Sequence, residues 1–244
     1  MIRVPVSPLV EGRQTLNRDT SHYVCRVLRL GAGANFIAFD PTAKAEAIAT
    51  VVAASGEAAE IDAQTPRPAS IVASTSLVLV YCLSKGDKVD AVVRDATELG
   101  ATSIVVARSS RSIVKTDDER AAAKLDRWRR IVDQAARQCG RADPPRVEGI
   151  LPWAEALSLA CSQAEARYCL WESATEPLGT TLQEVLARNT SLAFAVGPEG
   201  GLSSEEVDVA RAIGFQPKSL GRFVLRTETV PAAVLGAVRI LAAS

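Results

Sequence analysis

From residue 77 to the C-terminus, short apolar runs alternate with longer amphipathic segments, and this alternation restricts the fold more than any other feature of the sequence. Residues 77–83 are continuously apolar over the length of a buried strand. In residues 87–99 the apolar side chains recur at helical spacing until Gly100, a residue suited to ending a helix. Strands that alternate with helices in this way predict a mostly parallel sheet, with helices on both faces.

The remaining apolar segments continue the alternation to the end of the chain. We expect further strands at residues 103–107, 146–149, 168–171, 192–197 and 217–220. We expect further helices at residues 117–139, 153–163, 178–188, 203–213 and 230–242. Together these segments predict an α/β fold for the larger part of the chain.

The first part of the chain has a different pattern. Its β-like runs, at residues 24–30, 36–39 and 47–52, are separated by Gly and Pro and predict a small β-rich domain. Residues 64–70 contain two prolines and no periodic apolar residues, which indicates a linker or a turn. We therefore expect two domains, at residues 1–70 and 71–244.

The composition excludes several classes of protein. Hydrophobic residues make up 48% of the chain, as in ordinary soluble globular proteins. No apolar run approaches the roughly 18 residues of a membrane span, and the start lacks a signal peptide pattern, so we expect a cytoplasmic protein. With His22 as its single histidine and no Cys-x-x-Cys pair, the chain has few ligands for zinc, and we expect no metal.

The charge is balanced overall but not along the chain. The formal net charge is zero, yet residues 108–146 contain eleven Lys and Arg against six Asp and Glu. A neutral protein with one basic segment can hold a phosphate backbone locally. A solvated helix face is the alternative interpretation of the same segment.

A glycine-rich loop follows the predicted strand at residues 192–197. Residues 197–201 contain three glycines and a proline, which let a backbone approach a ligand closely. Ser203 and Glu206 have the spacing of a capping box, so a helix is expected to begin there. Because ligands bind at the carboxyl ends of the strands in open α/β sheets, this loop is a candidate ligand site.

A second loop, at residues 219–229, also lies between a strand and a helix. Thr229, Pro231 and Glu228 suit the start of the following helix. Arg226 does not, because the helix dipole disfavours a cation at this end. Arg226 is therefore the functional candidate of this loop.

The two loops resemble the signature of the RsmE family in the SPOUT superfamily, whose members methylate N3 of a uridine in small-subunit ribosomal RNA. The matching motifs are Gly-Pro-Glu-Gly-Gly-Leu at residues 197–202, Leu-Gly at 220–221 and Leu-Arg-Thr-Glu-Thr at 225–229. Similar blocks occur in the same order at residues 22, 27–29, 85–87, 96–100, 111–112 and 138–141. Arg222-Phe223-Val224 departs from the usual Pro-Arg-Ile of the family, so the resemblance assigns no contacts to Arg222 and Phe223.

The resemblance implies a fold and an activity. It implies a PUA-like β-barrel at residues 1–70 and a SPOUT methyltransferase domain at 71–244, with a C-terminal trefoil knot. It also implies a homodimer that binds S-adenosylmethionine, with small-subunit ribosomal RNA or the assembled 30S subunit as its substrate. A non-catalytic RNA-binding assembly factor and a methyltransferase of another RNA or base are the alternatives.

The resemblance also implies roles for particular residues. The expected catalytic residues are Arg226, which would stabilise negative charge on the base, and Glu199 or Glu228, which would accept the proton. The expected cofactor-binding residues are Leu170, Trp171, Glu172, Gly197, Pro198, Gly200, Gly201, Leu220, Gly221, Leu225 and Thr227. The expected RNA-binding residues are His22, Arg26, Arg29, Lys85, Arg111, Lys115, Arg137 and Arg141.

Overall fold

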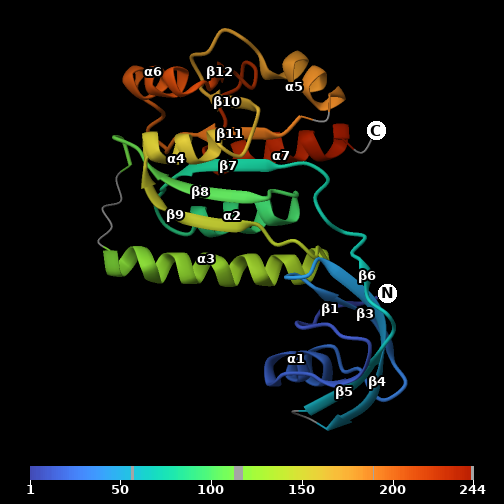
Figure 1. Cartoon of the computed structure of the whole chain (residues 1–244). Helices are drawn as coiled ribbons and strands as arrows, with labels where there is room; N and C mark the ends of the chain where they lie inside the picture. The colour runs from blue at the N-terminus through green and yellow to red at the C-terminus, as the bar shows by residue number, and fades with distance from the viewer. Residues whose placement is uncertain (56–57, 113–117, 189, 243–244) are drawn as a thin grey trace. The chain divides into compact units, whose positions relative to one another are not determined.

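The protein forms two compact units in the computed structural model, which describes residues 1–55, 58–112, 118–188 and 190–242 (Figure 1). The first unit comprises Met1–Val72 and Ala136–Pro144, and the second comprises Ala73–Ala135 and Pro145–Ser244. The chain therefore returns to the first unit after it has entered the second. The expected domains, residues 1–70 and 71–244, do not assign residues 136–144 to the first unit.

The second unit contains a six-stranded sheet in which all neighbouring strands are parallel. The strand order is β12-β10-β11-β7-β8-β9. The strands are β7 (Leu77–Cys82), β8 (Ser103–Arg108), β9 (Arg146–Pro152), β10 (Ala166–Leu170), β11 (Leu192–Val196) and β12 (Gln216–Lys218). The predicted parallel sheet is confirmed, and each strand overlaps its predicted range.

A helix follows each of these strands, as the alternation predicts. They are α2 (Lys88–Glu98), α3 (Asp118–Cys139), α4 (Trp153–Cys161), α5 (Leu178–Ala187), α6 (Ser204–Ile213) and α7 (Thr229–Ala242). Among the described residues, no helix is both long enough and apolar enough to cross a membrane.

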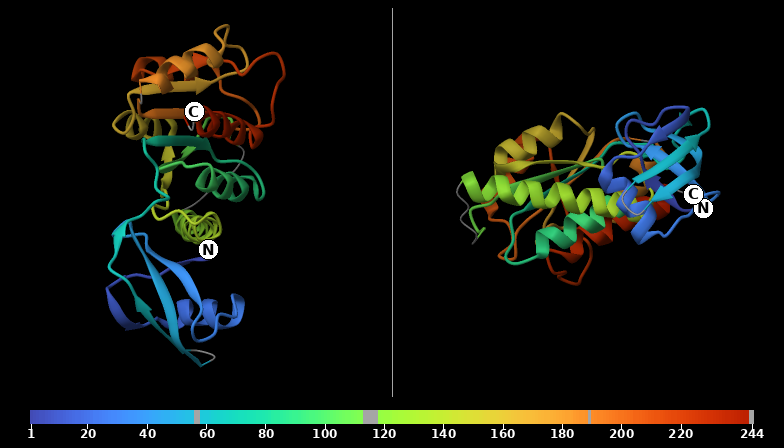
Figure 2. Two further views of the ribbon diagram at one scale, coloured as in Figure 1. Left: turned by 90° about the vertical axis from the view of Figure 1, so that its right-hand side faces the viewer. Right: turned by 90° about the horizontal axis from the view of Figure 1, so that it is seen from below.

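Strand β7 shows why the sheet has helices on both faces. Its side chains alternate between the faces, as in any strand. Val78 and Val80 pack in a cluster with residues of α4 and α6, whereas Leu79 and Tyr81 pack with residues of α2, α5 and α7. All four are fully buried, which accounts for the uninterrupted apolar run in the sequence. The views in Figure 2 show this layered arrangement of the second unit.

The strand order reverses beside β7. Strands β8 and β9 extend the sheet on one side of β7, and β11, β10 and β12 extend it on the other. Because all the strands are parallel, the loops that follow β7, β10, β11 and β12 meet at one edge. A reversal of this kind is where open α/β sheets bind their ligands.

The first unit is built on a mostly antiparallel sheet of order β1-β3-β4-β5-β2, with β6 paired to β4. Its strands are β1 (Arg3–Pro5), β2 (Gly12–Thr15), β3 (Asn35–Asp40), β4 (Ala45–Ser55), β5 (Ala58–Ala63) and β6 (Arg67–Pro68). The predicted β-rich domain is confirmed. The predicted linker at residues 64–70 contains β6 and so forms part of this sheet.

The predicted strand at residues 24–30 is wrong, because residues 24–27 lie in a helical turn and residues 28–30 form no strand. Helix α1 (Arg18–His22) continues into one π-helical turn at Tyr23–Val27. The Asn17 side chain caps α1 by accepting a hydrogen bond from the Thr20 backbone N–H at 2.9 Å. Val24 and Leu28, four residues apart, both pack against the core of the first unit, and this is helical spacing.

The segment 136–144 is tied into the first unit by a buried ion pair. The Arg3 Nε atom donates to the Gly140 carbonyl at 2.7 Å, and Arg3 Nη2 lies 2.8 Å from Glu46 Oε2. Glu46 is only 1% exposed and also accepts a hydrogen bond from Ser70 Oγ at 3.0 Å. Burial alone would raise the pKa of Glu46, but the hydrogen bonds from Arg3 and Ser70 hold it below its usual value.

Candidate functional site

Two adjoining cavities lie at the carboxyl ends of β10 and β11. The larger one, the main pocket, has a volume of about 360 Å³, and the smaller one, the side pocket, has a volume of about 120 Å³. They share Leu170, Glu172, Val224, Leu225 and Val230. The remaining residues of the main pocket are Lys88, Val196, Gly197, Pro198, Glu199, Gly201, Leu202, Arg226, Thr227 and Glu228. The remaining residues of the side pocket are Trp171, Leu220, Gly221, Arg222 and Phe223.

The two loops singled out in the sequence meet in the main pocket. The buried hydroxyl of Thr227 donates a hydrogen bond to the Gly197 carbonyl at 2.5 Å. Gly197 has no room for a side chain, because a Cβ atom there would lie 2.8 Å from Cγ of the buried Leu202. Gly201 has a φ of +68°, a conformation that glycine adopts without penalty. Packing and backbone conformation therefore account for two of the three glycines.

The third glycine, Gly200, does not line either pocket. Its carbonyl accepts a hydrogen bond from Arg111 Nη1 at 3.0 Å. Beside it, the predicted capping box is confirmed, since Ser203 and Glu206 bond reciprocally at the start of α6. Glu206 Oε1 also accepts the Ser110 backbone N–H at 2.7 Å. The loop after β8 is thus fastened at two points, to Gly200 of the glycine loop and to Glu206 in the first turn of α6.

Lys88, the first residue of α2, joins two acids of the main pocket. Its Nζ atom lies 3.3 Å from Glu199 Oε1 and 3.1 Å from Glu228 Oε2. Glu199 Oε1 also accepts the Lys85 backbone N–H at 3.1 Å. Sequence reasoning missed Lys88, although it is a cation at a helix N-terminus, the same signal that identified Arg226.

These contacts shift the acid–base properties of all three groups in the expected directions. Burial would raise the pKa of Glu199, but hydrogen bonds from backbone N–H groups and from Lys88 hold it below its usual value. A backbone hydrogen bond lowers the pKa of Glu228, and Lys88 and Arg226 lower it further. The hydrogen bond to Glu228 raises the pKa of Lys88. At neutral pH both acids are therefore carboxylates and Lys88 is an ammonium.

The charges of the main pocket do not cancel. Its lining includes three acids, Glu172, Glu199 and Glu228, and two bases, Lys88 and Arg226. Arg226 is exposed, so its guanidinium is accessible from solvent. With its acids ionised the pocket carries one net negative charge, which favours a ligand with one net positive charge.

The structure brings together most of the predicted cofactor residues, since all of them except Gly200 line one of the two cavities. The three predicted catalytic residues lie in the main pocket as well. The sequence did not identify the apolar lining residues Val196, Leu202, Val224 and Val230. Leu202 ends the motif at residues 197–202, which could have identified it, whereas the three valines are residue types that occur at any apolar position.

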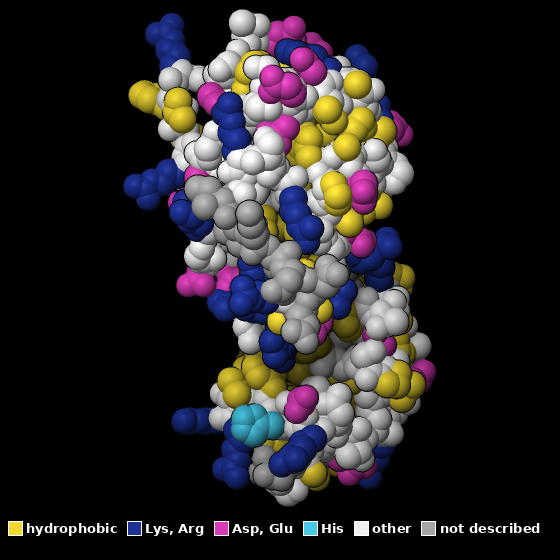
Figure 3. All heavy atoms as spheres, turned by 90° about the vertical axis from the view of Figure 1, so that its left-hand side faces the viewer, with side chains coloured by type: hydrophobic (Ala, Val, Ile, Leu, Met, Phe, Trp, Pro, Cys, Tyr) yellow, Lys and Arg dark blue, Asp and Glu magenta, His cyan; other side chains and the backbone are white. Residues whose placement is uncertain are grey.

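The predicted RNA-binding residues are placed less uniformly. His22, Arg26 and Arg29 are exposed on the first unit, and Figure 3 shows the histidine, in cyan, beside Lys and Arg side chains. Lys85 and Arg111 are exposed on the second unit. These five residues are accessible to a phosphate backbone.

The other three predicted RNA-binding residues differ. Arg137 is half-buried, with its guanidinium carbon 5.9 Å from the centroid of the Tyr23 ring. Lys115 lies outside the described residues. Arg141 is only 4% exposed and forms an ion pair of 3.0 Å with Asp143. A guanidinium so deeply buried does not reach a phosphate, so the structure does not support Arg141 as an RNA contact.

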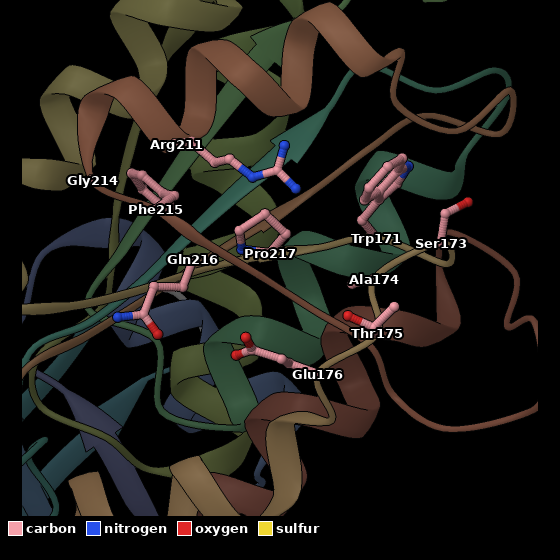
Figure 4. Close-up of a pocket in the computed structure, with 10 residues that line it drawn as sticks. All are labelled: Trp171, Ser173, Ala174, Thr175, Glu176, Arg211, Gly214, Phe215, Gln216 and Pro217. Carbon is pink, nitrogen blue, oxygen red and sulfur yellow. The ribbon is translucent and has the colours of Figure 1, made fainter.

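A third cavity, with a volume of about 740 Å³, lies beside β12 (Figure 4). Figure 4 shows Arg211 of α6 extending in the direction of Trp171. Both charged residues of this cavity are already paired, Arg211 with Asp208 at 2.8 Å and Glu176 with Lys218 at 2.7 Å. Because the predicted residues and the uncompensated charge gather elsewhere, the main pocket is the candidate site. In the described part of the chain, no group of three or more His, Cys, Asp or Glu side chains is arranged to hold a metal ion.

Comparison with protein families matches both units. The profile of an RNA methyltransferase domain matches residues 73–239, and that of an RNA methyltransferase PUA domain matches residues 16–64. A curated relative, the ribosomal RNA small subunit methyltransferase E of Synechocystis sp., is 31% identical over 98% of this chain and 77% of its own length.

Two solved structures resemble the whole chain. The ribosomal RNA small subunit methyltransferase E of Neisseria gonorrhoeae, bound to S-adenosyl methionine, has a TM-score of 0.84 and 29% identity. That match covers 99% of this chain and 98% of the other. A methyltransferase from Legionella pneumophila in complex with the same cofactor has a TM-score of 0.84 and 25% identity, covering 98% of this chain and 97% of the other.

Proposed function

Because the chain belongs to the ribosomal RNA small subunit methyltransferase E family of RNA methyltransferases, we propose that it transfers a methyl group from S-adenosylmethionine to N3 of a uridine in small-subunit ribosomal RNA. One observation carries the proposal. The two signature loops line a single pocket, and the hydrogen bond from Thr227 to Gly197 joins them there. The pocket lies at the reversal of strand order, where this class of sheet binds ligands.

The residues of the main pocket fit this cofactor. S-adenosylmethionine, when bound, supplies a methyl group activated by a sulfonium, and the molecule carries one net positive charge. The pocket carries one net negative charge, through three carboxylates and two cations. The apolar side chains of Leu170, Leu225 and Val230 suit the adenine ring, and the small residues Gly197 and Gly201 in the pocket lining let the backbone approach the ligand closely.

The chemistry requires charge stabilisation at the base. When the N3 proton leaves, negative charge develops on the uracil ring, and Arg226 at the opening of the main pocket is the proposed stabilising group. Glu199 and Glu228 are the proposed proton acceptors, but Lys88 makes both of them weaker bases by lowering their pKa values. Arg226 therefore contributes the larger share of the proposed catalysis.

The proposed RNA substrate reaches both units. His22, Arg26 and Arg29 on the first unit, and Lys85 and Arg111 on the second, are the proposed phosphate contacts, as exposed basic side chains. The proposed substrate is small-subunit ribosomal RNA, either free or in the assembled 30S subunit. The proposal also includes a cytoplasmic location and a trefoil knot in the C-terminal segment.

A homodimer is also part of the proposal. Phe223 and Val224, in the loop that lines the side pocket, are 87% and 83% exposed. Adjacent apolar side chains with this exposure are typical of a surface that a partner covers. A second copy of the chain is the proposed partner, which would bring this loop to a symmetric interface.

Methyl transfer can be measured directly. Purified protein, S-adenosylmethionine labelled on its methyl group and either small-subunit RNA or 30S subunits should yield 3-methyluridine, detected by mass spectrometry of digested RNA. We expect Arg226→Ala to lower turnover by about 10²- to 10³-fold while cofactor affinity is retained. Arg226→Lys, which keeps the charge, should lose less.

Each contrary result excludes a different part of the proposal. Wild-type turnover by Arg226→Ala would exclude the role of Arg226. Cofactor binding without 3-methyluridine would favour a different RNA or base as the substrate. If calorimetry detected no binding of S-adenosylmethionine, a non-catalytic RNA-binding assembly factor would be favoured.

A further inference from the structure

Lys88 occupies a position that the proposed reaction does not by itself explain. It is the first residue of α2, and its ammonium lies within 3.3 Å of one carboxylate oxygen on each of two different loops. Glu199 belongs to the loop after β11, and Glu228 immediately precedes α7. The side chains of all three residues are between 25% and 33% exposed, so the cluster is partly shielded from solvent.

We propose that Lys88 is a positioning residue of the main pocket, which bridges Glu199 and Glu228 and keeps both carboxylates ionised where the sulfonium cofactor binds. This inference rests on the proposed function, since it assigns Lys88 a role in binding the same cofactor. Lys88 itself need not touch the cofactor. It acts through the two acids, whose charge attracts a cationic ligand.

The other charged groups around the cluster do not replace Lys88. Arg226 contributes to the low pKa of Glu228, but the contribution of Lys88 is larger. Glu172, across the main pocket, adds a further negative charge. Burial raises the pKa of Tyr81 on β7, and the charges of Glu228 and Glu199 raise it further, so this hydroxyl is neutral at ordinary pH.

On the outer side of α2, Arg127 already pairs with Asp87 and Asp90. The backbone N–H of Lys85 donates to Glu199, but its side chain is exposed. Within the described part of the chain, Lys88 is thus the cation that the two acids share. Without it, burial and the proximity of a second carboxylate would raise the pKa of at least one acid.

The pKa increase expected without Lys88 determines how cofactor affinity depends on pH. A carboxylate attracts the cofactor only when ionised, so affinity is lost as the pH falls through the pKa of that carboxylate. In the wild-type protein both pKa values lie below the usual value of 4.5, and affinity should change little between pH 8 and pH 5.5. In Lys88→Met the loss should begin at a higher pH.

Calorimetric titration with S-adenosylmethionine at pH 8 and pH 5.5 tests the proposal. For Lys88→Met we expect affinity to fall about threefold or more between these pH values, the loss that results when one of the two acids is ionised in only about a third of the molecules at pH 5.5. For the wild-type protein and for Lys88→Arg, which keeps the charge, the change should be smaller than twofold. Arg94→Met is the matched control, because Arg94 lies on the same helix in an exposed ion pair with Asp95.

Two further measurements separate electrostatics from simple loss of structure. S-adenosylhomocysteine lacks the sulfonium charge, so its binding to Lys88→Met should depend less on pH than that of S-adenosylmethionine. The double variant Lys88→Met with Glu228→Gln should lose most of the added pH dependence, because one of the two acids can no longer titrate. Circular dichroism establishes that each variant is folded at both pH values.

Some outcomes overturn the inference, and another overturns the proposed function. If Lys88→Met lost the same factor in affinity at both pH values, or if Lys88→Arg behaved as Lys88→Met, the inference would be wrong while cofactor binding stood. If the wild-type protein bound neither S-adenosylmethionine nor S-adenosylhomocysteine, the proposed function itself would fail.

Discussion

Gly197 and Gly200 lie three positions apart in one loop, yet the structure constrains them differently. A Cβ atom at Gly197 would lie 2.8 Å from Leu202 Cγ, so an alanine there must displace a buried leucine or the loop itself. A Cβ atom at Gly200 would lie 3.5 Å from Arg111 Cβ, an ordinary contact. We expect Gly197→Ala to weaken binding of S-adenosylmethionine by about tenfold or more, since 1.4 kcal/mol of strain suffices for that.

Gly200→Ala is the control and should bind S-adenosylmethionine within about twofold of the wild-type protein. Calorimetric titration of the two variants makes the comparison. Equal losses in both would mean that the whole loop, and not the packing of Leu202, limits binding.

The two glycines also show which features of single residues could be predicted from the sequence. The cluster of glycines was visible in the sequence, but their separate reasons, the close packing of Leu202 against Gly197 and the positive φ of Gly201, appear only in the folded loop. Arg226 was found because a cation is unexpected at a helix N-terminus, and Lys88 satisfied the same rule unnoticed. The burial of Arg141 could not be predicted from the sequence. An acid two residues away, such as its partner Asp143, also occurs beside exposed arginines.

Helix α6 begins with a capping box that serves two purposes, and this leads to a prediction for two variants. Ser203→Ala should lower the free energy of unfolding by about 1 kcal/mol, because the side-chain cap on the Glu206 N–H is lost. Glu206→Ala should lower it by more, since the Ser110 N–H loses its acceptor as well. It should also weaken binding of S-adenosylmethionine, because the loop after β8 then keeps only one of its two anchors, the hydrogen bond from Arg111 to Gly200.

Urea unfolding and calorimetry measure the two effects separately. Ser204→Ala, at the adjacent exposed position, is the control for both. Cofactor affinity that stayed unchanged in Glu206→Ala would mean that the loop after β8 does not support the pocket.

The elements of the second unit were predictable because two strong patterns coincide in them. Strands buried on both faces, such as β7, give uninterrupted apolar runs, and helices such as α2 give a clear period before a glycine. The strand predicted at residues 24–30 was wrong. The branched side chains of this segment favour a strand, whereas the cap at Asn17 and the hydrogen bonds of Ser21 stabilise a helix. Of these contacts, only the hydrogen bond from the Ala59 backbone N–H to the Ser21 hydroxyl joins segments that are distant in the sequence.

The proposed homodimer predicts a change in the size of the whole molecule. Replacing both Phe223 and Val224 by serine removes the exposed apolar pair from the proposed interface. We expect the dissociation constant of the dimer to rise by about tenfold or more, as the loss of two apolar contacts implies. Analytical ultracentrifugation over a range of concentrations measures this constant.

Val10→Ser, at a position 49% exposed in the first unit, is the control and should leave the dimer intact. If the wild-type protein sedimented as a monomer at every concentration, the homodimer would be excluded. If the double variant dimerised as tightly as the wild-type protein, the interface would lie elsewhere.

The pairing of Arg3 with the Gly140 carbonyl has a consequence for the order of events during protein synthesis. The two residues are 137 positions apart, and both belong to the first unit. When the N-terminal segment leaves the ribosome, its backbone partner has not yet been made, and the unit lacks its last segment until Pro144 has been added. The usual rule that the N-terminal domain folds first during translation therefore applies to only part of the first unit. Its final closure waits until the intervening sheet strands β7 and β8 and helix α3 have been synthesised.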